Sequence, residues 1–238
     1  GESRVGGQHV ENESHTEVWS VGQIYRVAAM GLLLGLPLAM FYGAVRYDNL
    51  LSLLTPIQSS DSRAILFIVF SLVVALGSWR VAKRSGRAAS ARLLGKGDQV
   101  GSGILLGALL LVATFAYRAY LPEWEWLGNY YLDLAHLTPA AALALALIPL
   151  SEIFFRPFAF PAYEARYGSH MAVLLSGSLS ALVFVTPAPL LLASGLLLAS
   201  LYRRNRSGSF ALAAQFTLNL GLLAAVTLMP LLRSLFVG

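Results

Sequence analysis

The residues of this chain best suited to chemistry lie in the segment Ser151-Glu152-Ile153-Phe154-Phe155-Arg156. If the segment is helical, Glu152 and Arg156 form an i, i+4 pair whose opposite charges can neutralise each other on one face. The pair follows a long apolar run, 140–150, and a charge at the centre of a bilayer costs about 2.5–3.5 kcal/mol. A carboxylate kept at such a cost predicts either a functional site or an ion pair that joins two helices, and spacing alone leaves both open.

The composition identifies the class of protein that must position this pair. Of the 238 residues, 57% are hydrophobic and 12% are charged, whereas a soluble domain typically carries about 25% charged residues. The apolar residues are gathered into runs long enough to cross about 30 Å of hydrocarbon. We therefore expect an all-α polytopic membrane protein with about seven transmembrane helices. The expected spans are 24–45, 64–81, 103–120, 137–155, 169–186, 190–202 and 210–229.

Charge asymmetry between the loops predicts the orientation of these spans. Basic residues are concentrated in the loop 83–96 and again in 203–206, whereas the loop 122–133 is acidic and aromatic. Lysine and arginine are enriched in cytoplasmic loops, so the N-terminus is expected in the cytoplasm. The net charge of +5 is accounted for by these loops and does not indicate a nucleic-acid partner. The excess of arginine over lysine, with abundant Ala and Leu, suggests a bacterial inner-membrane protein.

We expect two regions along the chain. Residues 1–23 are polar and should form a flexible cytoplasmic tail, with Trp19 at the membrane surface, and residues 24–236 should form a single transmembrane domain. Pro157 lacks a backbone N–H and predicts a kink or break after the fourth span. The stretch 158–168 that follows is expected to be an interfacial helix or loop.

Three short motifs follow one another in the second half of the chain. Ser151-Glu152-x-x-x-Arg156 precedes Phe184-x-x-x-Ala188, and Gln215-x-x-x-Asn219 comes last. This order, with an aromatic stretch and then a Ser-rich helix behind the first motif, resembles the CPBP family of CAAX-processing and bacteriocin-processing intramembrane proteases, related to the Abi proteins. That family carries Glu-Glu-x-x-x-Arg, Phe-x-x-x-His and His-x-x-x-Asn. The resemblance implies a CPBP-like helical core at about 137–229, with the site at the cytoplasmic end of the fourth span.

The departures from the family pattern bear on activity. Ser151 stands where the resemblance implies a water-activating glutamate, and Ala188 and Gln215 stand where it implies histidines. Loss of one acid–base group typically costs about 10²–10⁴ in rate, and residues that act as a unit fail together. Three such changes predict a site without proteolytic activity. The positions that match the family are Glu152, Arg156, Phe184 and Asn219.

The serines of this region offer another kind of chemistry. Ser151, Ser176, Ser178 and Ser180 are potential nucleophiles, but a serine needs a nearby base such as His or Lys. The expected spans four to seven contain no lysine, and His136 and His170 are expected near opposite membrane faces. Small residues at helical spacing more often allow close helix packing.

Gln215 and Asn219 lie four residues apart and should share one helix face inside the membrane. Their amides could hydrogen-bond to Ser151 or to the Glu152–Arg156 pair, at about 0.6–2 kcal/mol per bond. Such a cluster would be structural, and ligand binding is the alternative. The histidines lack the spacing and the carboxylate neighbours of a zinc site, so no metal or cofactor is expected.

These observations favour a catalytically inactive, CPBP-like membrane protein that serves as a structural or partner-binding subunit. The expected partners are membrane lipids and another membrane protein or a hydrophobic or lipidated peptide. The alternative is a diverged intramembrane CAAX-type endopeptidase that uses Glu152. A small transporter is less favoured, because the chain shows no inverted repeat and few intramembrane charges.

Overall fold

The computed structural model describes residues 19–47, 60–85, 93, 95, 97–120, 138–183 and 189–237. Throughout these ranges the chain is helical or irregular, without a strand, and the predicted all-α polytopic membrane fold is confirmed. The α-helices are α1 (Val21–Tyr47), α2 (Ser60–Arg84), α4 (Val100–Tyr120), α6 (Pro139–Leu147), α7 (Phe160–Tyr167), α8 (Ser169–Val183), α9 (Pro189–Asn205) and α10 (Gly208–Val237). Between them lie the 3₁₀-helices η2 (Gly97–Gln99) and η4 (Ile148–Ser151) and the π-helix η5 (Phe154–Ala159).

The run Pro139–Tyr167 is continuous, and we count it as one helical stretch. The described residues then form seven helical stretches, in agreement with the expected number of about seven. Five of them are long and apolar enough to cross a membrane: α1, α2, α4 with η2, the run Pro139–Tyr167, and α10. The remaining two, α8 and α9, have 15 and 17 residues. They are shorter than the roughly 20 residues of a typical span.

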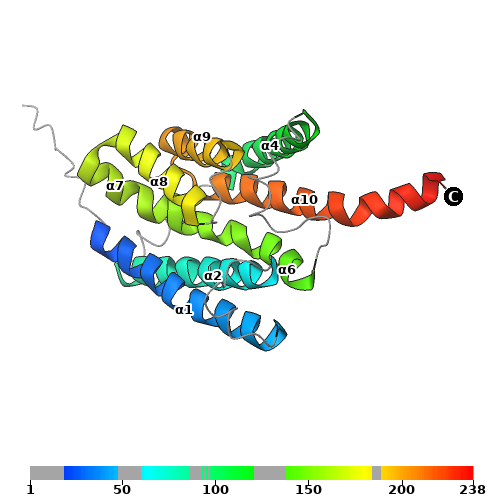
Figure 1. The fold of residues 1–238 in the computed structure, drawn as a ribbon. Coiled ribbons are helices and arrows are strands. Elements are labelled where there is room, and N and C mark those ends of the chain that lie inside the picture. Colours follow the sequence, from blue (N-terminus) through cyan, green and yellow to red (C-terminus); the bar gives the residue numbers. More distant parts are fainter. Residues whose placement is uncertain are drawn as a thin grey trace, which may run out of the picture.

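The run Pro139–Tyr167 is the centre of the bundle. In Figure 1 it lies between the α1–α2 pair on one side and α4, α8, α9 and α10 on the other. More of it is buried than of any other described span, as expected for a helix surrounded by protein rather than by lipid. Its residues therefore occupy the positions best shielded from the hydrocarbon.

Small residues let the outer helices pack closely in pairs. A Cβ placed on Gly77 of α2 would stand 2.9 Å from Cγ1 of Val27, so these residues face each other across α1 and α2. A Cβ on Gly107 of α4 would stand 2.4 Å from the carbonyl oxygen of Ala214 on α10. Contacts of this kind bring helix backbones together in membranes, where packing replaces the hydrophobic effect.

Of the kink or break predicted at Pro157, the break does not occur, because the helical run continues through this residue. Pro149 lies in the 3₁₀-helix η4, and Pro157 lies inside the π-helix η5. A π turn pairs residues five apart and replaces the i, i+4 bond that proline cannot donate. The chain thus changes helical pitch on both sides of Glu152 without leaving the helix.

The N-terminal boundary also differs from expectation. Helix α1 begins at Val21, inside the stretch assigned to the tail, after a capping box in which Ser20 N–H donates to Gln23 Oε1 at 2.9 Å. Trp19 was expected at the membrane surface, but it is only 4% exposed. Its ring packs on Phe158 with centroids 5.0 Å apart, because the capped turn directs it into the aromatic core beside η5.

The stretch 158–168, expected to be an interfacial helix or loop, is helical up to residue 167; its first half is buried and residues 165–168 are exposed. Its exposed edge carries Glu164, whose carboxylate accepts two hydrogen bonds from the guanidinium of Arg206, the second at 2.8 Å. The same guanidinium lies 5.5 Å over the ring of Phe160. Hydrogen bonding to Glu164 raises the pKa of Arg206, so the turn between α9 and α10 is held on α7 by a permanent charge.

Candidate functional site: a buried polar centre

The Glu152–Arg156 pair forms inside the central helix, between the 3₁₀ turn and the π turn. Arg156 Nε donates to Glu152 Oε2 at 2.8 Å. The arginine is 0% exposed and the glutamate 4%. Both charges are therefore removed from lipid and from water and must be neutralised where they lie.

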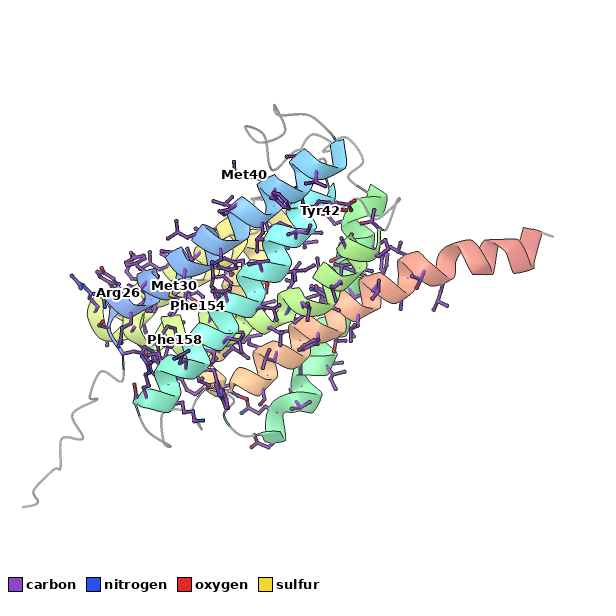
Figure 2. The ribbon with its side chains drawn as sticks, turned by 90° about the horizontal axis from the view of Figure 1, so that it is seen from below. Arg26, Met30, Met40, Tyr42, Phe154 and Phe158 are labelled. Carbon is purple, nitrogen blue, oxygen red and sulfur yellow. The ribbon has the colours of Figure 1, made fainter. Side chains whose placement is uncertain are left out.

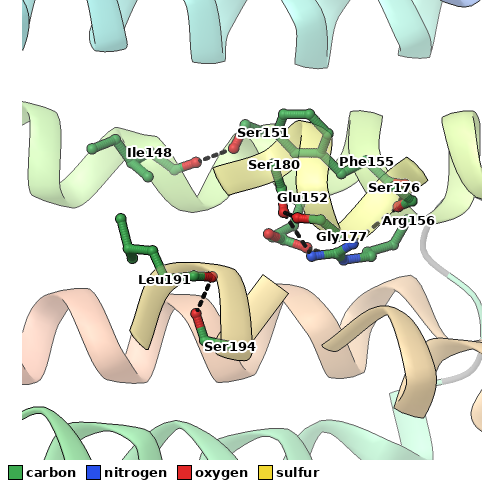
Figure 3. A network of polar contacts seen from close by, with 10 residues as sticks. All are labelled: Ile148, Ser151, Glu152, Phe155, Arg156, Ser176, Gly177, Ser180, Leu191 and Ser194. Carbon is green, nitrogen blue, oxygen red and sulfur yellow. Dashed lines mark hydrogen bonds and ion pairs between the residues drawn. The ribbon is translucent and has the colours of Figure 1, made fainter. Parts of the chain in front are cut away.

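Two serines of α8 complete the coordination of Arg156. Its Nη1 donates to Ser176 Oγ at 2.9 Å and its Nη2 donates to Ser180 Oγ at 3.2 Å (Figure 3). Each serine hydroxyl in turn donates a hydrogen bond. Ser176 donates to the carbonyl oxygen of Phe155 and Ser180 to that of Gly177, both at 2.7 Å. All three guanidinium nitrogens are thus engaged, and this network joins α8 to the central helix. We call Glu152, Arg156, Ser176 and Ser180 the buried polar centre.

Helix α9 packs closely against Ser180, one of these two serines. A Cβ on Gly195 would stand 2.6 Å from the carbonyl oxygen of Gly177 and 2.9 Å from Ser180 Oγ. Glycine therefore allows α9 to lie against α8 at the level of Ser180. The sequence predicted Ser176 and Ser180 as packing residues and missed their bonds to Arg156. Their four-residue spacing on one face of α8 was the available signal.

Ser151, the first position of the first motif, is turned away from the buried polar centre. Its Oγ donates to the carbonyl oxygen of Ile148 at 2.7 Å (Figure 3). A short side chain in this conformation satisfies its donor within its own helix. Ser151 makes no described hydrogen bond to Glu152, although the two residues are adjacent in the chain.

Asn219 has a partner that the sequence analysis did not foresee. Its Nδ2 donates to the carbonyl oxygen of Leu145 at 3.1 Å. In an α-helix that carbonyl would accept from the N–H of residue 149, but residue 149 is a proline. Asn219 thus supplies from α10 the donor that Pro149 lacks. The predicted bonds from Asn219 to Ser151 or to the Glu152–Arg156 pair are wrong for this reason.

Gln215 lies one turn before Asn219 on α10 and is half-buried. It makes no hydrogen bond with any residue that the structure describes, so its predicted bond to Ser151 or to the pair is also not formed. Phe184 and Ala188, which complete the second motif, lie outside the described residues. Within the described ranges, no three His, Asp or Glu side chains gather as metal ligands would.

The core around the polar centre is aromatic. Phe154 and Phe155 meet edge to face with centroids 5.2 Å apart, and Phe154 and Phe158 lie 5.9 Å apart. Phe154 and Phe158 point into the bundle between the central helix and the α1–α2 pair (Figure 2). These rings form an aromatic core beside the central helix, and the serines of α8 contact Arg156.

Residues 134–221 match the family described as type II CAAX prenyl endopeptidase Rce1-like. This segment contains the central helix, the buried polar centre and Asn219, and the match bears out the predicted resemblance to the CPBP family. No curated protein and no solved structure matches the chain significantly.

Proposed function

Because residues 134–221 carry the Rce1-like segment of the CPBP family, we propose that this integral membrane protein is a catalytically inactive relative of the CAAX endopeptidases. It acts as a structural or partner-binding subunit of a membrane complex. The membrane is the cytoplasmic membrane of a bacterium, and the partner is another membrane protein or a hydrophobic or lipidated peptide.

The observation that carries this proposal is the full hydrogen bonding of the Arg156 guanidinium inside the buried polar centre. Each nitrogen of Arg156 donates to a neighbouring side chain, and the first-motif serine donates to its own helix. Donors that are already hydrogen-bonded to neighbouring side chains are not available to bind a substrate. Such a network is what helix association inside a membrane requires.

The chemistry of hydrolysis supports the same conclusion. Cleavage of a peptide bond needs a base to deprotonate water and donors that hold the developing oxyanion. Serine at position 151 and glutamine at position 215 cannot titrate near neutral pH. The amide of Asn219 is already bonded to a backbone carbonyl.

The test compares the parent protein with Glu152→Gln, purified in mild detergent and given a transmembrane or CAAX-type peptide. We expect no cleavage above background from either protein, and a membrane partner recovered in stoichiometric amount with the parent. Ser178→Ala is the matched control, because it removes a hydroxyl from α8 without touching Arg156. Cleavage that disappears on Glu152→Gln, together with no stoichiometric partner, refutes the proposal.

One observation favours a second candidate, a diverged intramembrane endopeptidase that uses Glu152 as its base. Only Oε2 of this carboxylate is engaged by Arg156, and Oε1 has no hydrogen-bond partner among the described residues. Oε1 is then the atom that would accept a proton from water. This candidate requires cleavage that resists metal chelators and is lost on Glu152→Gln.

A further inference from the structure

A patch of cationic side chains lies on the α1–α2 pair, at the end of the bundle where α1 begins and α2 ends. Its members are exposed, and the described parts of these two helices contain one acid, Asp61, in the first turn of α2 at the opposite end. No carboxylate of α1 or α2 is therefore available to neutralise the patch. We call Arg26, Arg80, Lys83 and Arg84 the α1–α2 patch.

The register of the two helices brings the patch to one side. Val27 and Gly77 face each other across the antiparallel pair. Arg26 precedes Val27 and Arg80 lies three residues after Gly77, so helical periodicity places both on the same flank of this contact. Ser78, on the other flank, is buried. The patch thus faces away from the bundle, and Figure 2 shows Arg26 at the outer end of α1.

The same flank continues into an apolar surface. Met30 and Leu33 on α1 and Leu76 on α2 follow the patch toward the middle of the membrane, and they are 54%, 71% and 66% exposed. Arg80 is also preceded by an exposed aromatic residue, Trp79. Tyrosine and tryptophan are enriched at the level of lipid headgroups.

A ligand that covers this flank must join an anionic head to hydrocarbon. Inorganic phosphate or a nucleic acid would neutralise the arginines but would leave the apolar strip uncovered, and a neutral lipid would do the reverse. We infer that the α1–α2 patch binds the headgroup of an anionic phospholipid whose acyl chains lie along Met30, Leu33 and Leu76. Arg26 and Arg80 contact the phosphate, and Trp79 lies beside the glycerol region. This lipid site is independent of whether the buried polar centre is catalytic.

The test measures binding of phosphatidylglycerol and of phosphatidylcholine to the full-length protein in mild detergent, by native mass spectrometry. A cation near an anionic membrane surface contributes about fivefold in binding. The double variant Arg26→Gln/Arg80→Gln should therefore bind phosphatidylglycerol about 25-fold more weakly and phosphatidylcholine as before. Arg203→Gln/Arg204→Gln, which removes the same charge from α9, should leave phosphatidylglycerol binding within about twofold of the parent.

A charge-conserving variant distinguishes loss of the lipid site from loss of the fold. Arg26→Lys/Arg80→Lys should retain most of the phosphatidylglycerol binding, and the lipid-free thermal midpoint should match in all variants. Unchanged phosphatidylglycerol binding in the glutamine variant overturns the inference, as does equal loss for both lipids. An equal loss in the α9 variant, or competition by glycerol phosphate as strong as by the lipid, overturns it too.

Discussion

Removing one partner of the Glu152–Arg156 pair should destabilise the protein more than removing both. Arg156→Met leaves a carboxylate that is 4% exposed without its counter-charge, and breaking a buried pair in this way typically costs about 3–5 kcal/mol. The variant also loses two serine hydrogen bonds, at about 0.6 kcal/mol each inside a membrane. In the double variant Glu152→Leu/Arg156→Met no buried charge remains, so the cost falls to about 1 kcal/mol for the two serine bonds.

The assay is thermal unfolding in mild detergent of the parent, the two single variants and the double variant. At roughly 2–4 °C per kcal/mol for a chain of this size, Arg156→Met, with a total cost of about 4–6 kcal/mol, should lower the midpoint by about 8–25 °C and the double variant by about 2–4 °C. Arg204→Met, which removes an exposed arginine, is the control and should change little. A double variant as unstable as Arg156→Met would refute the view that each charge is there to neutralise the other.

Two further substitutions test how α8 and α9 hold the buried polar centre. Gly195→Ala should destabilise by about 1–3 kcal/mol, because its Cβ would stand 2.9 Å from Ser180 Oγ. Gly101→Ala, where nothing lies within 4 Å, should be neutral or stabilising in the same unfolding assay. Ser176→Ala should cost about 0.6–1.7 kcal/mol, whereas Ser178→Ala should not, and equal effects of the two serine variants would show that the Arg156 contact contributes nothing.

The pairing of Glu152 with Arg156 could be predicted from sequence because it is local. Residues four apart share a face in any helical segment, and the pair persists even though the chain passes from a 3₁₀ turn to a π turn around it. The expected number of helical stretches rests on an equally local property, the length of the apolar runs. Neither needs knowledge of how one helix lies against another.

The contacts of Ser176, Asn219 and Trp19 could not be predicted, because each depends on register between elements far apart in the chain. The acceptor of Asn219 is the carbonyl that Pro149 leaves without its i+4 donor, and only the packing of α10 on the central helix shows that the two meet. Hydropathy and periodicity say nothing about a single residue before a helix, so the burial of Trp19 does not follow from them.

The bond from Asn219 to Leu145 has a consequence for biogenesis. During synthesis the central helix emerges well before α10, and the carbonyl of Leu145 then lacks the i+4 N–H of an α-helix, because Pro149 supplies none. An unsatisfied carbonyl in hydrocarbon is costly, so the central helix should reach its full stability in the membrane only after α10 has been made. Insertion of the last helix therefore completes the fourth, and a chain stopped before Asn219 should be treated by quality control as unassembled.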